Sequence, residues 1–495
     1  MVKRIIKCGN CKSLLFALSV VFIIVVSNAG AIDISNGLTS VSPNSAKPGE
    51  TVSITFTLSS SVFPTPPTNK TPNSVLLGTI IGTNIVRTSG SSYITSSFTI
   101  PSDQSCTSLN AIVVFQMTNE LNYMLDDGFS INMGTTKDII YVNANSTAET
   151  PDGTSWNTAL KLLQDAFEVA NCYSATQIWV AAGTYYPTTD NDRTAYFELI
   201  SNLTIYGGFK GNETQLSERD YVNNVTILSG DIGVAGNQTD NTYHVLVGAN
   251  SAILDGFTIT GGYANGAPDV DTDETLRWHR LGGGMYNENV SPTIINCTFS
   301  NNYANSGGAM YNHNYASPTI SNCTFNNNSA QNGGALLARV GSDAIISDSS
   351  FSNNHADWRG GAIYIGYGAN PSLSNTRFYT NTTDGNGGAV YVDDRSSQLG
   401  NTKPNITRCT FENNSATYRG GAISGYNNAT YICIEDSIFT TNSAGSGGGA
   451  IACESDPIIT LIGENTFTSN SGGTGDADKD NNNEDCAIVT ATTCP

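Results

Sequence analysis

The chain has 495 residues, a formal net charge of −20 and only 13% charged residues. No two Lys or Arg residues are adjacent after Arg4, so the chain lacks the basic stripes that bind nucleic acid and anionic membranes. We therefore expect no nucleic-acid partner, and we expect a polyanionic sugar to bind only through bridging calcium. We also expect no direct membrane insertion of the mature chain, because no stretch after residue 31 approaches eighteen apolar residues.

Residues 1–31 have the pattern of a secretory signal peptide. Basic residues, among them Lys3 and Arg4, precede an apolar run at residues 14–26, and Ala29-Gly30-Ala31 offers a small-residue cleavage site. The apolar run is too short to span a bilayer comfortably. We therefore expect a secreted or cell-surface protein, which would be associated with the outer membrane in a bacterium.

Residues 32–133 are predicted to form an immunoglobulin-like β-sandwich. Residues 52–58 alternate between apolar and polar side chains, and further strand-like runs follow between turn signals such as Pro48-Gly49. Short strands at this spacing are typical of a sandwich of about one hundred residues. The opening Ser40-Val41-Ser42-Pro43 resembles that of bacterial immunoglobulin-like modules. A spacer and a binding module both remain open for this domain.

Residues 138–176 are predicted to cap the repetitive domain that follows them. Leu160, Leu163, Phe167 and Ala170 are spaced so that they lie on one face of a helix over residues 158–170. Because the repeats start at residue 177, we expect this short helix to cover the open end of the first repeat and to protect an exposed sheet edge.

Residues 177–473 are predicted to form one repetitive domain. Seven copies of a pattern begin with two adjacent glycines and a small residue and end with Phe-x-x-Asn, with successive phenylalanines 26 to 33 residues apart. The pairs are Phe299/Asn302, Phe325/Asn328, Phe351/Asn354, Phe378/Asn381, Phe411/Asn414, Phe439/Asn442 and Phe467/Asn470. A fixed period of this length is the signature of a solenoid.

Within each copy the side chains alternate with period two, as in Cys297-Thr298-Phe299, and no helical stripe is present. An aliphatic residue lies five positions before each phenylalanine, and another follows each glycine pair, as at Ile294 and Met310. We therefore predict three short strands per copy. The predicted fold is all-β, a right-handed single-stranded parallel β-helix. We call one turn of this helix a coil, and we expect roughly eleven coils.

The repeated asparagines are predicted to form a ladder. Coils stack at about 4.8 Å, so identical side chains at a turn can hydrogen-bond to the coils above and below. Asn also tolerates the left-handed conformation that a tight turn needs, and the glycine pairs supply a second bend. We therefore assign the Phe, Asn and Gly residues a structural role.

The paired Gly-Gly-Ala-aliphatic and Phe-x-x-Asn motifs resemble those of the chlamydial polymorphic membrane proteins and related secreted bacterial β-helix proteins. Upstream segments such as Asp152-Gly153-Thr154-Ser155-Trp156 and Leu254-Asp255-Gly256-Phe257 are similar to the first coils of such proteins. The resemblance implies a surface-exposed or secreted rod that is often adhesive.

An aromatic residue recurs three positions after the second glycine, at Tyr286, Tyr311, Tyr364 and Tyr391. If these rings point outward, they form a stacking surface for sugars or for a partner. The alternative is that they only shield the surface of the strands.

Two acidic stretches are candidate calcium sites, because alternating carboxylates offer the oxygen ligands that calcium takes. One consists of Asp269, Asp271 and Asp273, in an insertion between coils, and the other of Asp476, Asp478 and Asp480, in an acidic tail at residues 474–495. Neither has the glycine of an EF-hand loop, and the alternative for the first stretch is a solvated acidic loop without a metal ion. In the same tail, Cys486 and Cys494 offer a disulfide that closes a small loop.

A catalytic alternative rests on Asp393, Asp394 and Arg395, in the repeat that is lengthened to 33 residues. Pectic lyases on β-helices use calcium-binding acids with an arginine base, and related hydrolases use clustered aspartates. The preferred hypothesis is a non-catalytic, exported rod that binds glycans or a neighbouring cell surface through repeated side-chain columns. The alternatives are a pectate-lyase-like polysaccharide lyase or a glycoside hydrolase, and a structural surface-layer component. No cofactor is required, with calcium as an option.

Overall fold

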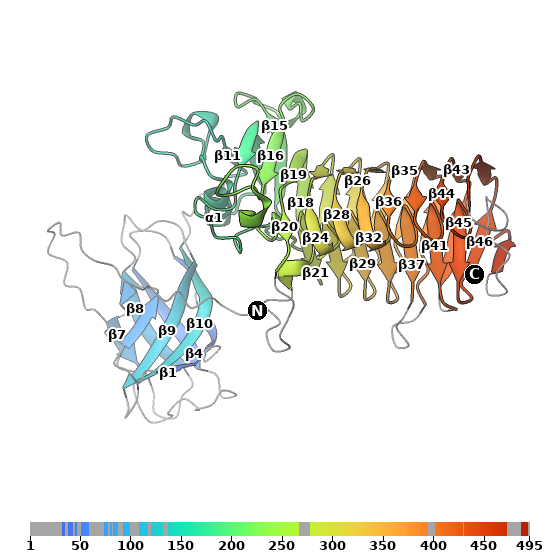
Figure 1. Cartoon of the computed structure of the whole chain (residues 1–495). Coiled ribbons are helices and arrows are strands. Elements are labelled where there is room, and N and C mark those ends of the chain that lie inside the picture. The colour runs from blue at the N-terminus through green and yellow to red at the C-terminus, as the bar shows by residue number, and fades with distance from the viewer. Residues whose placement is uncertain are drawn as a thin grey trace. The chain divides into compact units, whose positions relative to one another are not determined.

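The computed structural model describes residues 137–266, 278–394, 401–428, 430–472 and 487–493, together with the strands between Ile32 and Ile131. The chain divides into two compact units, residues 1–137 with 171–174 and residues 138–170 with 175–495 (Figure 1). Among the described residues, no helix is long and apolar enough to cross a membrane. The predicted signal peptide lies outside the described residues.

The first unit contains two sheets in its described part. Its strands are β1 (Ile32–Ile34), β2 (Leu38–Ser42), β3 (Ser45–Ala46), β4 (Thr51–Leu58), β5 (Ser74–Leu77), β6 (Ile80–Ile81), β7 (Thr83–Val86), β8 (Tyr93–Thr99), β9 (Ser108–Gln116) and β10 (Glu120–Ile131). One sheet has the order β1-β10-β9-β5-β6 with β3 beside β10, and the other has the order β2-β4-β8-β7. Phe56 and Phe98 are fully buried with ring centroids 5.8 Å apart. Whether this unit is immunoglobulin-like stays a prediction.

The second unit begins with a strand and a short helix. Strand β11 (Ile139–Val142) is followed by the 3-10 turn η1 (Trp156–Thr158) and by α1 (Leu163–Tyr173). The helix therefore begins at Leu163 rather than at residue 158, because Leu160 is bridged to Val142 in a parallel pairing. Phe167 of α1 lies against Phe197, with ring centroids 6.5 Å apart, in the first strand of one of the long sheets.

The rest of this unit forms four parallel sheets, numbered here I to IV in the order in which one coil passes through them. Sheet I contains β11, β12 (Gln177–Ala181), β15 (Thr204–Phe209), β18 (Ile253–Asp255), β22 (Thr293–Ile295), β26 (Thr319–Ser321), β30 (Ile345–Ser347), β34 (Ser372–Ser374), β38 (Asn405–Thr407), β42 (Tyr431–Glu435), β46 (Ile458–Ile462) and β48 (Ala487–Thr490). Sheet II contains β13 (Gly183–Tyr185), β16 (Thr226–Ser229), β19 (Phe257–Thr260), β23 (Thr298–Ser300), β27 (Thr324–Asn326), β31 (Ser350–Ser352), β35 (Arg377–Tyr379), β39 (Thr410–Glu412), β43 (Ile438–Thr440) and β47 (Thr466–Thr468).

Sheet III contains β20 (Tyr263–Ala264), β24 (Tyr303–Ser306), β28 (Ser329–Asn332), β32 (His355–Arg359), β36 (Thr382–Thr383), β40 (Ser415–Ala416) and β44 (Ser443–Ala444). Sheet IV contains β14 (Phe197–Glu198), β17 (Leu246–Val247), β21 (Met285–Glu288), β25 (Met310–His313), β29 (Leu336–Arg339), β33 (Ile363–Gly366), β37 (Val390–Asp393), β41 (Ile423–Tyr426) and β45 (Ile451–Glu454). Three further 3-10 turns are η2 (Leu216–Glu218), η3 (Gln238–Asp240) and η4 (Trp278–Arg280).

Each strand pairs with the equivalent strand of the next coil, so the backbone winds as a parallel β-helix (Figure 1). Phe299 pairs in register with Phe325, and Phe325 with Phe351. The sequence predicted three strands per coil, whereas the repeats have four. Sheet III is the addition, and it lies between the asparagine turn and the glycine bend.

The ladder of asparagines is present along the interior. From Asn302 to Asn442, each side-chain Nδ2 and backbone N–H donates to Oδ1 of the asparagine one coil further on, at 2.9–3.1 Å. The residue in the left-handed conformation is the one before the ladder residue, as at Asn301 and Asn327, and not the ladder asparagine itself. The ladder residues therefore use their amides for hydrogen bonding and leave the turn geometry to their neighbours.

The phenylalanines form a second internal column. Neighbouring rings from Phe299 to Phe467 stack with centroids 4.5–5.0 Å apart and planes within 2–12° of each other. Cys297, Cys323 and Cys409 are buried free thiols, as expected for small core residues, whereas Cys433 and Cys453 are disulfide-bonded. The possible Cys486–Cys494 disulfide lies outside the described residues.

Candidate functional site

The tyrosine column is buried. Tyr286, Tyr311, Leu337, Tyr364 and Tyr391 are register partners along sheet IV, and their exposed fractions are only 1–8%. Tyr286 stacks on Tyr311 with centroids 5.8 Å apart, and Tyr364 stacks on Tyr391 at 5.5 Å. The expectation that these rings form an exposed stacking surface is therefore wrong, and shielding of the strands is the better description.

The glycine bend explains why these rings are covered. Gly282 has a φ of +62°, and a Cβ added there would lie 3.0 Å from the Cβ of Tyr311 in the next coil. The glycine bend of one coil thus packs against the Cβ atom of the tyrosine in the next coil. Trp278, Leu281 and Tyr426 also pack against the column. The rings of this column are consequently enclosed, although they lie on the strand face opposite to the core.

The aspartates of the catalytic alternative are also buried. Asp393 ends strand β37 with an exposed fraction of 0%, and Asp394 has 2%. The carboxylate of Asp394 accepts a hydrogen bond from the Thr402 backbone N–H at 3.0 Å. An Arg359 guanidinium nitrogen lies 4.0 Å from the Asp393 carboxylate. The two aspartates therefore do not offer an exposed acid–base pair, and Arg395 lies outside the described residues.

The predicted calcium ligands cannot be placed. Asp269, Asp271, Asp273, Asp476, Asp478 and Asp480 all lie outside the described residues, so calcium binding there stays a prediction.

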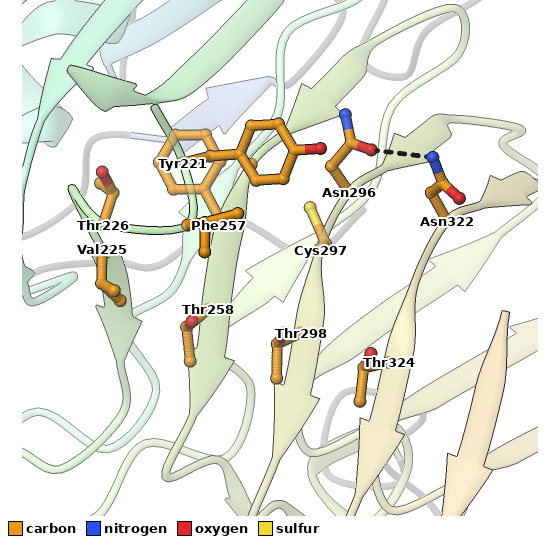
Figure 2. Close-up of a pocket in the computed structure, with 12 residues that line it drawn as sticks. Tyr221, Val225, Thr226, Phe257, Thr258, Asn296, Cys297, Thr298, Asn322 and Thr324 are labelled. Carbon is orange, nitrogen blue, oxygen red and sulfur yellow. Dashed lines mark hydrogen bonds between the residues drawn. The ribbon is translucent and has the colours of Figure 1, made fainter. Parts of the chain in front are cut away.

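The structure instead contains a hollow on the outer face of sheet II, near the start of the β-helix. Its volume is about 480 Å³. Its lining consists of Tyr221, Val222, Val225, Thr226, Gly256, Phe257, Thr258, Asn296, Cys297, Thr298, Asn322 and Thr324. Figure 2 shows Thr258, Thr298 and Thr324 on successive strands, with Tyr221 and Phe257 to one side of the row. We call this the Tyr221 hollow.

The floor of the Tyr221 hollow is set by strand alternation. In β23 the Phe299 side chain points into the core, so Thr298 points outward and stays half-buried. Thr258 and Thr324 are the register partners of Thr298 on either side, and Ser350 continues the row. The repeat therefore produces a row of hydroxyl groups over four coils, which ends where Ile227 and Arg377 take the equivalent positions.

The wall comes from a loop between β15 and β16. The Glu213 carboxylate accepts hydrogen bonds from the backbone N–H groups of Lys210, Gly211 and Asn212 at 2.5–3.0 Å, and the Trp156 indole donates to the Glu213 carbonyl at 2.9 Å. Burial alone would raise the pKa of Glu213, but these backbone hydrogen bonds outweigh it and lower the pKa. An ionised carboxylate therefore fixes the fold of this loop.

A chain of polar groups supports the rim. Arg219 donates to the Asp255 carboxylate at 2.6 Å, Asp255 accepts from Asn296 at 2.8 Å, and Asn296 accepts from Asn322 at 3.3 Å. The Arg219 guanidinium also lies 5.3 Å from the centroid of the Tyr221 ring. The Arg219 guanidinium thus packs against the Tyr221 ring, while 38% of the Tyr221 residue stays exposed.

The chemistry of the lining is that of a binding surface. None of the twelve lining residues is Asp, Glu, His, Lys or Arg. Cys297 is 1% exposed, and burial raises the pKa of its thiol well above the ordinary value, so it does not supply a thiolate nucleophile. Hydroxyl and amide groups beside an exposed aromatic ring suit a neutral, polar ligand.

Sequence reasoning missed the Tyr221 hollow because its parts come from two kinds of segment. The hydroxyl row belongs to the repeat, but Tyr221 and Val222 belong to a loop in an earlier coil, which has no glycine pair at the bend before sheet IV. The signal in the sequence was the interruption of the strand pattern at residues 210–225, which follows an otherwise regular strand.

One comparison with known proteins gives a match. Residues 282–471 match the family model described as "Right handed beta helix region". Searches of curated proteins and of solved structures give no significant match. Together with the stacked parallel strands, this match confirms the predicted fold class, an all-β right-handed parallel β-helix. Such a domain is compatible with a surface protein and with a pectate-lyase-like fold.

Proposed function

We propose that this chain is an exported surface or extracellular protein that binds neutral glycans at the Tyr221 hollow without cleaving them. The observation that carries the proposal is the composition of the lining, in which hydroxyl and amide groups surround an exposed tyrosine ring and charged side chains are absent. A sugar presents hydroxyl groups at its edge and C–H groups on its face, so it matches both kinds of surface.

Further observations support export and adhesion. The signal-peptide pattern of residues 1–31 directs the chain out of the cytoplasm, and the disulfide bonds of Cys433 and Cys453 fit an oxidising compartment. The resemblance of the repeats to chlamydial polymorphic membrane proteins favours an adhesive role. Because the hydroxyl row covers four coils, from Thr258 to Ser350, a glycan chain can make several weak contacts along it.

The alternative of a polysaccharide lyase or hydrolase is weakened by the burial of Asp393 and Asp394. The structural surface-layer alternative requires no ligand at all. These three functions are distinguished by a screen of the purified chain on a glycan array, together with a panel of polysaccharides assayed for reducing or unsaturated products.

We expect binding to neutral glycans and no product release. A Thr298→Val variant, which removes one hydroxyl from the middle of the row and keeps the shape of the side chain, should weaken binding about 3- to 10-fold, the worth of one hydrogen bond. Product release would support the enzyme, and an array without any hit would support the structural role.

A further inference from the structure

A second cluster of side chains lies on the outer face of sheet III, away from the Tyr221 hollow. His355 and Asp357 occupy alternate positions of strand β32, and Asp384 follows strand β36 of the next coil. One imidazole nitrogen and one carboxylate oxygen from each aspartate lie within 4.8 Å of one another. We propose that His355, Asp357 and Asp384 bind a divalent transition-metal ion of the zinc type.

The backbone fixes the three residues relative to one another. His355 and Thr382 are register partners, and the Asp384 backbone N–H donates to the Ala356 carbonyl at 3.1 Å. Asp384 therefore lies one coil beyond Asp357 in the sequence and beside it in space. Like charges side by side on neighbouring strands are destabilising, so a cation between the two carboxylates would reduce their electrostatic repulsion.

The imidazole is oriented for metal binding. Its Nδ1 lies 3.0 Å from the Thr382 hydroxyl, while Nε2 lies 3.5 Å from the Asp357 carboxylate and 3.9 Å from the Asp384 carboxylate. Metal-binding histidines commonly use one ring nitrogen as the ligand and hydrogen-bond through the other. An Nδ1–H that donates to Thr382 leaves the Nε2 lone pair directed toward the two carboxylates.

The ligand set selects the class of metal. Zinc–ligand bonds of about 2.0–2.2 Å place tetrahedral ligands about 3.4 Å apart, so ligand atoms that now lie within 4.8 Å of one another need to approach by up to about 1.4 Å. They have room to rotate, because their exposed fractions range from 39% to 72%. Calcium prefers an all-oxygen shell, so the imidazole favours zinc over calcium. Three protein ligands leave a fourth position for water or an oxygen ligand.

Calorimetric titration of Zn²⁺ alone into the full chain tests this site, with His355→Gln and Asp384→Asn as the deleting variants. Each of these two variants should weaken the affinity for Zn²⁺ at this site at least about tenfold. Thr382→Val removes only the hydroxyl that orients the imidazole, and it should weaken the affinity about tenfold. His313→Gln is the matched control, because His313 also lies near a carboxylate, that of Glu288 at 3.4 Å, but does not belong to the His355 cluster. It should change affinity less than about twofold.

Because the two aspartates are exposed and His355 is half-buried, the variants should fold, and circular dichroism checks this. Equal Zn²⁺ binding by the parent chain and by the His355 and Asp384 variants would overturn the assignment. The assignment would also be overturned if Ca²⁺ bound with the same affinity as Zn²⁺ and if His355→Gln left that Ca²⁺ affinity unchanged.

Discussion

At the scale of single residues, the repeat predicts position more reliably than exposure. The sequence places Tyr286, Tyr311, Tyr364 and Tyr391 in one column, and the structure confirms that they are in register. It does not predict that they are buried, because a side chain on the strand face opposite to the core normally faces water. Burial here depends on how closely the glycine bend approaches the next coil, which no local pattern encodes.

Truncation of the tyrosine column should destabilise the β-helix. Tyr391 is 1% exposed and stacks on Tyr364. Tyr391→Ala should lower the free energy of unfolding by about 3–5 kcal/mol, the usual cost of removing a large buried ring. Chemical denaturation measures the change, and Tyr391→Phe, which keeps the ring, serves as the control. A loss below about 1 kcal/mol for the alanine variant would mean that the column is open to solvent.

A buried histidine should make stability depend on pH. His244 is 2% exposed, it hydrogen-bonds through Nδ1 to the Gly282 carbonyl at 3.0 Å, and it stacks on Trp278. Burial lowers the pKa of His244 from 6.5 to about 4. The unfolded state therefore binds the proton more readily, and stability falls as the pH drops from 6.5 toward 4.

Between pH 7 and pH 4.5 this histidine should cost about 2 kcal/mol of stability. Denaturation of the parent chain and of His244→Gln at both pH values measures the contribution of His244. Both proteins contain the same carboxylates, so the pH dependence that these groups cause cancels in the comparison. The parent should lose more stability than the variant. Identical losses would show that His244 does not titrate with a lowered pKa.

At the scale of elements, the asparagine ladder shows which structural statements the sequence supports. The Phe-x-x-Asn spacing predicted a stacked turn, and the amide hydrogen bonds confirm it. The assignment of the left-handed conformation to the ladder asparagines was wrong, because the side-chain amide and the turn geometry are supplied by adjacent residues such as Asn302 and Asn301. Sheet III was also missed, since its strands of two to five residues carry little apolar pattern.

Removal of one ladder amide should be costly. In Asn354→Ala, the Asn328 backbone and side-chain N–H groups and the Phe325 carbonyl would all lose buried partners. An unsatisfied buried polar group costs about 1–3 kcal/mol, so we expect a loss of about 4 kcal/mol in chemical denaturation. Asn326→Ala, which changes a half-buried asparagine outside the ladder, should cost less than about 1 kcal/mol. Similar losses for both variants would argue against a special role of the ladder.

At the scale of the whole molecule, the period of the repeat predicts the fold, but the candidate sites arise from combinations that cross it. The Tyr221 hollow needs a loop from one coil packed over hydroxyl groups from the next three. The His355 cluster needs residues from neighbouring coils. Asp357 and Asp384 are separated by one period of the repeat, which brings them side by side. The acidic stretches noticed in the sequence are contiguous, whereas ligands in a β-helix come together across coils.

The most direct test of the proposed function compares two exposed tyrosines on the same β-helix. Tyr221 lines the hollow, while Tyr418, which is 58% exposed, is not among its lining residues. A neutral oligosaccharide selected on the array is titrated calorimetrically into the parent chain, Tyr221→Ala and Tyr418→Ala. We predict that Tyr221→Ala weakens affinity at least about tenfold, or about 1.4 kcal/mol, and that Tyr418→Ala changes it less than about twofold. Equal affinities for all three proteins, or a loss confined to Tyr418→Ala, would contradict the proposal.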